Sequence, residues 1–355
     1  SDIASGTDGG SWDEADKSLL FIKQYKNKVS NLTLDESLIS LEIFYNKHLI
    51  FDQLKTYYAL VGLILFILIL VDILSGRDIA CRYSKTAKYL IILGFAVHTL
   101  TLALRWYLSG HAPWSNGYES VIYVSWAILL SGILLSRHSL LALSASSIMS
   151  AVALFVAHLS WLDPEITNLV PVLKSYWLTI HVSVITGSYG FFALGFVLGI
   201  VNMLLMIART PSNQGRINPA INDLTIINEM ALFLGLILLT IGNFLGGVWA
   251  NESWGRYWGW DAKETWALVS ILVYAIVAHL RFIPKLKGAF IFNFASIVAF
   301  FSIIMTYFGV NFYLAGLHSY AKGDPVPIPD FIYYMLYTLA VIIIIAFVRD
   351  KKATQ

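Results

Sequence analysis

Nine stretches of this chain are apolar and long enough to cross, as helices, the ~30 Å hydrocarbon layer of a membrane. Inside hydrocarbon a backbone must satisfy its own hydrogen bonds, which leaves helices and closed barrels as the possible folds. Several of the stretches are uniformly apolar, without the alternation of a barrel strand. The sequence therefore predicts an all-α integral membrane protein, a bundle of about nine transmembrane helices. The predicted spans are residues 57–74, 87–108, 119–136, 139–160, 176–208, 228–249, 265–283, 288–313 and 331–348.

The composition agrees with this class and narrows the chemistry. Hydrophobic residues make up 57% of the chain and charged residues 13%, whereas a soluble domain carries about 25% charged residues. The formal net charge of +2 gives no reason to expect a nucleic acid as partner. Cys81 is the single cysteine, so the chain has no CxxC pair, and any thiol chemistry would use the sulfurs of a partner.

Basic residues in the short loops orient the bundle. One set of loops and ends holds most of them: Arg77, Arg82, Lys85, Lys88, Arg137, Arg209, Arg216, Arg281, Lys285, Lys287, Arg349, Lys351 and Lys352. The opposite loops hold Arg105, Lys174, Arg256, Lys263 and Lys322. By the positive-inside rule the first set faces the cytoplasm, so the N-terminus is predicted outside and the C-terminus inside.

Three regions follow from this topology. Residues 1–56 are predicted to be an extracytoplasmic linker and surface helix, because residues 1–16 are rich in Gly, Ser and Asp and residues 17–56 carry helical apolar spacing. Residues 57–348 form the membrane domain, and residues 349–355 form a cytoplasmic tail. The start lacks a basic region followed by an apolar one. A chain that begins outside without a signal peptide is expected to be the downstream piece of a longer polypeptide.

A tryptophan-rich segment, WANESWGRYWGWDAKETW at 249–266, is predicted to form an outer loop between two spans. It holds five of the eleven tryptophans: Trp249, Trp254, Trp258, Trp260 and Trp266. Indoles can cover the faces of a large flat ligand such as a porphyrin, and Arg256 or Lys263 can meet carboxylates at its rim. The alternative is an ordinary interfacial aromatic belt, but a belt scatters its aromatics over many helix ends.

Two histidines are predicted at the same face as this loop. His181 lies just inside the outer end of the fifth span, and His318 lies just past the outer end of the eighth. Two neutral imidazoles converging on an aromatic surface can supply the two axial ligands of a haem iron. The alternative is a pair of unrelated interfacial histidines, each satisfied by water.

Three further histidines have weaker claims. His279 is placed about two-thirds of the way through the seventh span, where an ionisable group is a functional candidate by default. Its alternative is a neutral histidine that donates to a neighbouring helix. His98 in mid-span follows the same logic, and His111 in an outer loop is either structural or a contact to a haem propionate.

At this point the residues resemble a known family. WGRYWGWDAKETW resembles the "WWD" signature of the haem-handling proteins of cytochrome c biogenesis, and the flanking histidines resemble the pattern of the CcsA (ResC) family of system II. The resemblance runs from about Tyr57 to Val348 and includes RWYLSGHAPWSNGYES at 105–120. The start LEIFYNKHLIFDQL also looks like the junction of fused CcsB–CcsA chains, so the resemblance implies the CcsA half of such a chain.

The resemblance implies a cytochrome c haem lyase, or synthetase, of the bacterial inner membrane. Haem b would bind at an external site between His181 and His318, held by the tryptophan segment including Asp261, and would be attached to the CxxCH thiols of apocytochrome c. His279 would serve a second, transmembrane haem whose other ligand comes from a CcsB/ResB-like subunit or fused domain, or else from His98. Catalysis would be positioning, with no nucleophile in this chain.

Other functions remain open from the sequence. A haem exporter or chaperone without ligase activity would share these features, and only an assay of thioether formation separates the two. A quinol-oxidising cytochrome b pairs histidines about 13 residues apart on one helix, as His98 and His111 are spaced, but Gly110 and Pro113 break that helix. A general solute transporter would be expected to show inverted repeats, and none is evident.

Overall fold

The computed structural model describes residues 12–30, 36–159, 162–167, 174–314, 316 and 328–354, and divides the chain into two units, residues 1–49 and 50–355. The first unit contains α2 (Asp13–Ser30) and α3 (Glu36–His48). Lys23 of α2 forms an ion pair with Glu36 of α3. Because acidic residues suit the first turn of a helix, α2 begins already at Asp13, within the stretch predicted to be a linker.

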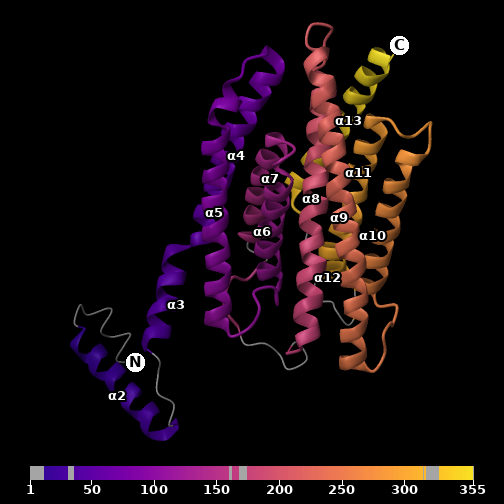
Figure 1. Ribbon diagram of the computed structural model, residues 1–355. Coiled ribbons are helices and arrows are strands. Elements are labelled where there is room, and N and C mark those ends of the chain that lie inside the picture. The colour runs from indigo at the N-terminus through magenta and orange to yellow at the C-terminus, as the bar shows by residue number, and fades with distance from the viewer. Residues whose placement is uncertain are drawn as a thin grey trace. The chain divides into compact units, whose positions relative to one another are not determined.

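The second unit is the helical bundle (Figure 1). In the described residues, nine segments are long and apolar enough to cross a membrane, so the predicted all-α membrane bundle is confirmed. Its helices are α4 (Ile50–Ser75), α5 (Ile79–Ser109), α6 (Gly117–Leu135), α7 (Leu140–Ala157), α8 (Tyr176–Ala208), α9 (Gln214–Trp254), α10 (Ala262–His279), α11 (Ala289–Ile304), α12 (Val310–Tyr313) and α13 (Asp330–Thr354).

Local sequence sets where the helices begin and end. Ser139 caps α7 by accepting hydrogen bonds from the Leu141 and Ala142 amides, which fixes the predicted turn between α6 and α7. Gly110 and Gly255 end α5 and α9 with φ of 69° and 71°, the left-handed conformation that glycine adopts without strain. The C-terminal limit of α9 at Trp254 means that the loop proper is only residues 255–261, shorter than the predicted loop.

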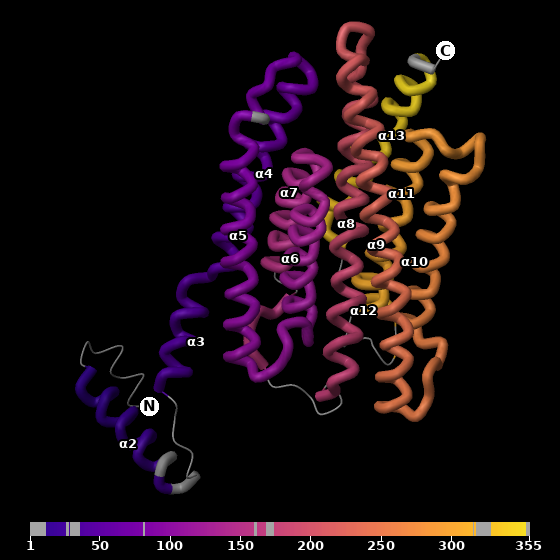
Figure 2. The backbone as a smooth tube through the Cα atoms, in the orientation of Figure 1, coloured from indigo at the N-terminus to yellow at the C-terminus, as the bar shows by residue number. Residues whose placement is uncertain are grey.

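The helices form two neighbouring layers, one of α4 to α7 and the other of α8 to α13. α4 packs on α5 and α7, α6 packs on α7 and α8, and α8 and α9 run side by side with the most extensive packing in the bundle (Figures 1 and 2). α10 packs on α9 and α11, whereas α13 packs chiefly on α8. α5 and α10 therefore belong to different layers of the bundle.

Buried amides join α8, α9 and α11 within the bundle. The Asn202 and Asn228 amides both donate to Asn293 Oδ1, at 3.0 and 2.9 Å, and Asn293 Nδ2 donates to Thr225 Oγ1 at 2.8 Å. All four side chains are buried. Hydrogen bonds of this kind hold transmembrane helices together where apolar burial gives no driving force.

The connections alternate between the two ends of the bundle, as the predicted topology requires. The loop after α5, the first turn of α8, the α9–α10 loop and the end of α12 share one end in Figure 1. The connections after α4, α6, α8 and α10 lie at the other end with the C-terminus of α13. The tryptophan segment and the start of α8 therefore meet at one end of the bundle.

Candidate functional site

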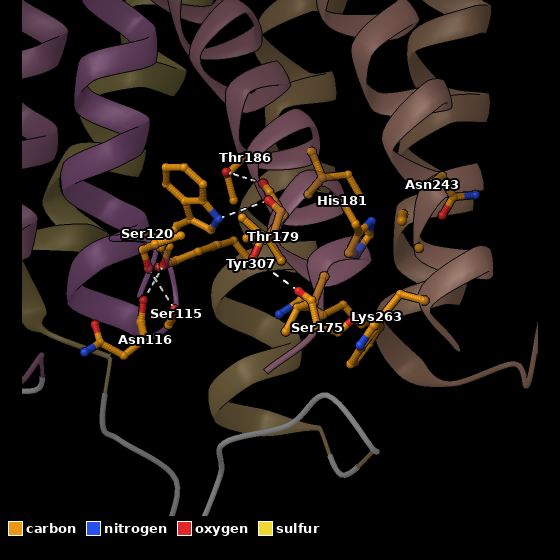
Figure 3. Close-up of a pocket in the computed structure, with 18 of the residues that line it drawn as sticks. Ser115, Asn116, Ser120, Ser175, Thr179, His181, Thr186, Asn243, Lys263 and Tyr307 are labelled. Carbon is orange, nitrogen blue, oxygen red and sulfur yellow. Dashed lines mark hydrogen bonds between the residues drawn. The ribbon is translucent and has the colours of Figure 1, made fainter. Parts of the chain in front are cut away.

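A cavity of about 760 Å³ opens at this end of the bundle (Figure 3). Its walls come from the loop after α5, the first turns of α8 and α10, the end of α9 and the segment joining α11 to α12. Its size falls within the range of small-molecule and cofactor sites, roughly 300–1,000 Å³. Large aromatic side chains form much of its lining, namely Trp106, Trp114, Tyr176, Tyr189, Trp249, Tyr257, Trp258 and Tyr307.

His181 lines the cavity from the second turn of α8. Its Nδ1 lies 2.7 Å from the carbonyl oxygen of Gly242 on α9, so Nδ1 is the protonated nitrogen that donates this bond. In a neutral imidazole the other nitrogen, Nε2, then carries the lone pair. The ring lies nearly parallel to the indole of Trp249, at an interplanar angle of 11° and a centroid distance of 6.3 Å. Figure 3 shows the His181 ring between α8 and the helix that carries Asn243.

The predicted haem-binding residues divide into two groups. Trp249, Trp258 and Lys263 line the cavity, whereas the lining does not include Trp254, Arg256, Trp260, Asp261 and Trp266. The indoles meet one another edge to face and not as a flat stack: Trp249 and Trp254 are tilted by 63°, and Trp258 and Trp260 by 89°. This geometry is common for aromatic pairs, because the positive edge of one ring meets the negative face of the other.

Several residues of the motif have local structural roles. Asp261 caps α10 by accepting from the Lys263 amide at 3.2 Å, and the Glu264 carboxylate accepts from the Asp261 amide at 3.2 Å, which makes a capping box. The guanidinium of Arg256 lies directly over Gly259, so a Cβ at residue 259 would have to displace it. Trp260 has a positive φ of 55° and is 71% exposed.

Lys263 is the cation that the tryptophan segment brings to the cavity wall. Its Nζ donates to Asn311 Oδ1 of α12 at 2.9 Å. This bond ties the first turn of α10 to the end of the eighth span. An ammonium in this place can meet a carboxylate that enters the cavity.

The opposite wall is the loop between α5 and α6, residues 110–116. Trp114 Nε1 donates to the Thr179 carbonyl of α8 at 3.1 Å, so this loop is fastened to the turn that precedes His181. His111 also lines the cavity, and its two ring nitrogens lie 3.2 Å from the carbonyl oxygens of Ala112 and Thr167. The sequence predicted His111 to be either structural or a contact to a haem propionate, and it placed Trp114 within the segment 105–120 that resembles the family. It did not indicate that these residues form a wall.

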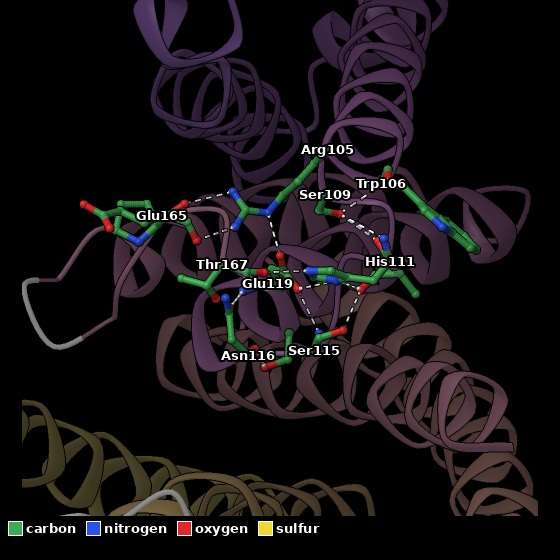
Figure 4. A network of polar contacts seen from close by, with 12 residues as sticks. Arg105, Trp106, Ser109, His111, Ser115, Asn116, Glu119, Glu165 and Thr167 are labelled. Atoms are coloured by element: carbon green, nitrogen blue, oxygen red, sulfur yellow. Dashed lines mark hydrogen bonds and ion pairs between the residues drawn. The ribbon is translucent and has the colours of Figure 1, made fainter. Parts of the chain in front are cut away.

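A buried ion pair stands behind this wall (Figure 4). Arg105 and Glu119 are both fully buried, with Arg105 Nε 2.9 Å from Glu119 Oε1. The other two guanidinium nitrogens donate to the carbonyls of Pro164 and Glu165 at 2.9 and 3.2 Å, and the amide of Ser115 donates to Glu119 Oε2 at 2.9 Å. The pair therefore joins two loops at the cavity end of the bundle. These hydrogen bonds compensate both charges for their removal from water.

A π-helical turn, η3 (Met305–Gly309), joins α11 to α12 and carries Tyr307 into the cavity. The Tyr307 hydroxyl lies 2.9 Å from the Gly117 carbonyl and 2.5 Å from Ser120 Oγ. π-turns inside helices occur often at functional sites. The sequence predicted one unbroken span over 288–313 and did not indicate the extra residue that makes this π-turn.

The structure separates the remaining candidate histidines. His318 lies outside the described residues; the nearest described residue, Gly316, lies against Asp261 so closely that a Cβ would not fit. His279 is the last residue of α10 and is exposed, not two-thirds along the span as predicted. Its Nδ1 donates to the Ala275 carbonyl of its own helix at 2.7 Å.

His98 is fully buried in the layer of α4 to α7. Its Nε2 lies 3.2 Å from the Ile122 carbonyl and its Nδ1 lies 3.4 Å from the Tyr58 hydroxyl. A neutral imidazole that donates through Nε2 and accepts through Nδ1 satisfies both contacts. The packing therefore accounts for both ring nitrogens of His98.

Comparison with known proteins agrees with these observations. A family model described as cytochrome C assembly protein matches residues 114–318, which include most of the cavity wall. Protein NrfI of Wolinella succinogenes is 52% identical over 86% of this chain, and the match covers 34% of NrfI. The cytochrome c biogenesis protein CcsA of Prochlorococcus marinus (strain AS9601) is 33% identical over 77% of this chain and 96% of its own length.

A third relative extends the comparison to another lineage. The cytochrome c biogenesis protein CcsA of Guillardia theta is 36% identical over 64% of this chain and 83% of its own length. The chain thus spans about a third of NrfI but nearly the whole of the Prochlorococcus protein. The nine-span bundle, the tryptophan segment and the sequence matches together show that the chain belongs to the CcsA family of cytochrome c assembly proteins and acts in cytochrome c maturation.

Proposed function

We propose that the cavity binds haem b at the outer face of the bacterial inner membrane and presents it for covalent attachment to CxxCH segments of apocytochrome c. The observation that carries this proposal is His181. A neutral imidazole faces an aromatic cavity of about 760 Å³ while its Nδ1 proton is held by a backbone carbonyl at 2.7 Å. Metal-ligating histidines usually have this second hydrogen bond, which fixes the ring and the tautomer.

The rest of the lining suits the same substrate. A porphyrin is flat and apolar with two carboxylates at one edge. Trp249, Trp258 and Tyr189 give the cavity aromatic walls, and Lys263 places a cation among them. Apolar lining with a few polar groups that converge on the ligand is the usual composition of a cofactor site.

His318 is proposed as the second axial ligand of this haem. His318 follows Gly316 by two residues in the sequence, and Gly316 lies against Asp261 of the tryptophan segment. Two imidazoles on opposite faces of the ring would complete a six-coordinate iron.

The chemistry that haem supplies is its pair of vinyl groups. Each cysteine thiol of a CxxCH segment adds across one vinyl: the sulfur bonds to the carbon next to the ring, the thiol hydrogen goes to the terminal carbon, and the double bond becomes single. This addition needs no external oxidant or reductant. The chain contributes position and orientation, which can lower a bimolecular barrier by several kcal/mol, on the order of 7–11 in favourable cases.

A second haem site is proposed at His279. The imidazole is exposed at the end of α10, and its Nδ1–H already donates within the helix. Nε2 then carries the lone pair with which this ring would bind a haem iron outside the bundle. His98 is occupied by Tyr58 and Ile122 in another layer. We therefore propose that the second ligand comes from a CcsB/ResB-like subunit or fused domain, as the greater length of NrfI also suggests.

Thioether formation is the direct test of the ligase activity. The purified protein, with a CcsB/ResB-like partner co-expressed, is incubated under reducing conditions with haem and a reduced peptide that contains CxxCH. We expect haem that stays with the peptide after acid and organic extraction. A peptide with both cysteines changed to serine is the matched control. If haem binds but no haem becomes covalent with either peptide, the protein is a haem exporter or chaperone and not a ligase.

A further inference from the structure

We infer that Gly246 of α9, together with the carbonyl of Gly242 one turn earlier, is the seat that fixes the orientation of His181. Both are positioning residues: they act on the cavity through the imidazole. The inference rests on the proposed role of His181 as a haem ligand and assigns two residues that the tryptophan motif does not contain.

The ring of His181 lies directly on Gly246. A Cβ at residue 246 would come within 2.5 Å of His181 Cε1, 2.8 Å of Nδ1 and 3.1 Å of Nε2. Nonbonded carbon atoms attract best at about 3.5–4.0 Å. An alanine therefore cannot occupy this position while the ring stays where it is. The absence of a side chain at 246 gives the imidazole the space that it fills.

Gly242 supplies the acceptor that holds the ring in that space. Its carbonyl accepts from His181 Nδ1 at 2.7 Å, and its lack of a side chain lets the helices approach, because a Cβ there would lie 3.0 Å from the Ile185 backbone nitrogen. Inside a helix this carbonyl is also the acceptor of the Gly246 amide, four residues later. The acceptor of the ring proton and the space for the ring thus come from one helical turn.

Trp249 encloses the ring from the same helix. Its indole is nearly parallel to the imidazole, tilted by 11°, and it is only 3% exposed. It lies three residues after Gly246, so the two positions share one face of α9. The imidazole is held between its own helix, α8, and this face of α9, so it has little rotational freedom. A side chain that is already ordered can bind iron without first being ordered by the ligand.

Gly246→Ala is the variant that tests the seat. The methyl group must displace the imidazole from the Gly242 carbonyl, and changes in the partners of a metal ligand typically lower metal affinity about 10–100-fold. We expect the purified full chain with this change to bind haem about 10–100-fold more weakly. Its reduced absorption spectrum should lose the six-coordinate form, and added imidazole should restore that form.

Gly235→Ala is the matched control on the same helix. A Cβ there would meet Cε1 of Phe192 at 2.8 Å, a similar degree of crowding away from His181. We expect this variant to lose thermal stability as Gly246→Ala does while keeping normal haem affinity. Gly242→Ala is a second test variant, because its Cβ would push the Ile185 backbone away from α9 and so draw His181 away from the Gly242 carbonyl.

Coupling to His181 separates positioning from general damage. In a His181→Gly background the methyl of Gly246→Ala has room, so the double variant should fold and should bind haem no more weakly than His181→Gly alone. Two results would contradict the positioning role of Gly246 and Gly242 and leave the ligand role of His181 intact. One is an equal loss of haem affinity in both backgrounds, and the other is normal haem affinity and spectrum in Gly246→Ala and Gly242→Ala. If His181→Gly alone binds haem normally with an unchanged spectrum, the proposed function fails, and this inference fails with it.

Discussion

Lys263 and Arg256 are the two cations of the tryptophan segment, and the cavity distinguishes them. Lys263 lines the cavity and Arg256 does not; the arginine instead covers Gly259. The sequence left both open as partners of the haem propionates, because either residue can reach several ångströms from the backbone. The choice depends on how α10 begins, which fixes the direction of the Lys263 side chain.

Lys263→Met should weaken haem binding about 10–100-fold. Losing a hydrogen bond to a charged group costs roughly 1.5–3 kcal/mol, and about 1.4 kcal/mol corresponds to a factor of ten. Titration of the purified protein with haem measures the loss, and Arg256→Gln is the control that should bind normally. Haem with both propionates esterified should bind wild type and Lys263→Met alike. A larger loss in Arg256→Gln than in Lys263→Met would assign the propionates to the arginine.

Some residues of the site could be predicted from sequence and others could not. His181 and the tryptophans were accessible because they stand out by type in short segments. Trp114 and Tyr307 were not, because their roles come from contacts across 65 and 190 residues, to Thr179 and Gly117. A pattern of buried residues in the sequence does not reveal such pairs. Which of the five indoles line the cavity and which lie outside it depends on the geometry of the loop.

The first turn of α10 positions three charged residues of the tryptophan segment. Asp261 caps it and Glu264 completes the capping box, while Lys263 between them reaches the cavity. The aspartate of the motif was predicted to bind haem, and this stays a prediction. In the structure its carboxylate accepts from the Lys263 amide and so caps α10, and Gly316 lies against it.

Asp261→Asn and Asp261→Ala should therefore behave differently. Asparagine caps a helix about as well as aspartate, whereas alanine costs about 1 kcal/mol. We expect Asp261→Asn to keep haem affinity and thermal stability close to wild type, and Asp261→Ala to lower both. If asparagine is as harmful as alanine, the negative charge of Asp261 acts on the ligand and the capping explanation is wrong.

Element boundaries show where sequence patterns succeed. The prediction of 176–208 coincides with α8, because apolar residues fill the whole helix and Arg209 follows it. α9 runs over 41 residues, from Gln214 to Trp254, well beyond the predicted 228–249, because its polar ends are helical outside the apolar stretch. Hydropathy reports what lies in hydrocarbon, and helices continue past it wherever the residues allow.

At the scale of the whole molecule, the two ends of the bundle carry different charge. The connections after α4, α6, α8 and α10 lie at one end with the C-terminus (Figure 1), and they are the basic set. Positive residues favour the cytoplasmic side, so the cavity end is proposed to face outward. The alternation of loops between the two ends could be predicted by counting spans. The packing of α8 against α9 and α6 could not, because the number of spans does not specify which helices are neighbours.

Cysteine labelling tests this orientation. In a Cys81-free background, single cysteines at Ser253 and Lys285 should react differently with an impermeant maleimide in intact cells. We expect labelling at 253, in the last turn of α9 at the cavity end of the bundle, and none at 285 until the cells are opened. Labelling of 285 and not 253 would invert the proposed topology.

The proposed second haem depends on a partner. The chain alone should hold at most the outer haem, and co-expression with a CcsB/ResB-like subunit should add a second one that His279→Ala removes. Haem-to-protein ratio and the reduced spectrum measure this. His98→Ala is the control, which should destabilise the α4–α7 layer without removing a particular haem. Two haems on the isolated chain, one of them lost in His98→Ala, would contradict the partner ligand.

The central claim is that His181 binds haem iron in the outer cavity, and the absorption spectrum of His181→Gly tests it most directly. The wild-type protein, purified in detergent and reduced, should show a six-coordinate bis-histidine haem. His181→Gly should lose that form, and free imidazole should restore it by filling the vacated axial position. An unchanged spectrum in His181→Gly, or wild-type protein that binds no haem even with ample haem and partner, would contradict the claim.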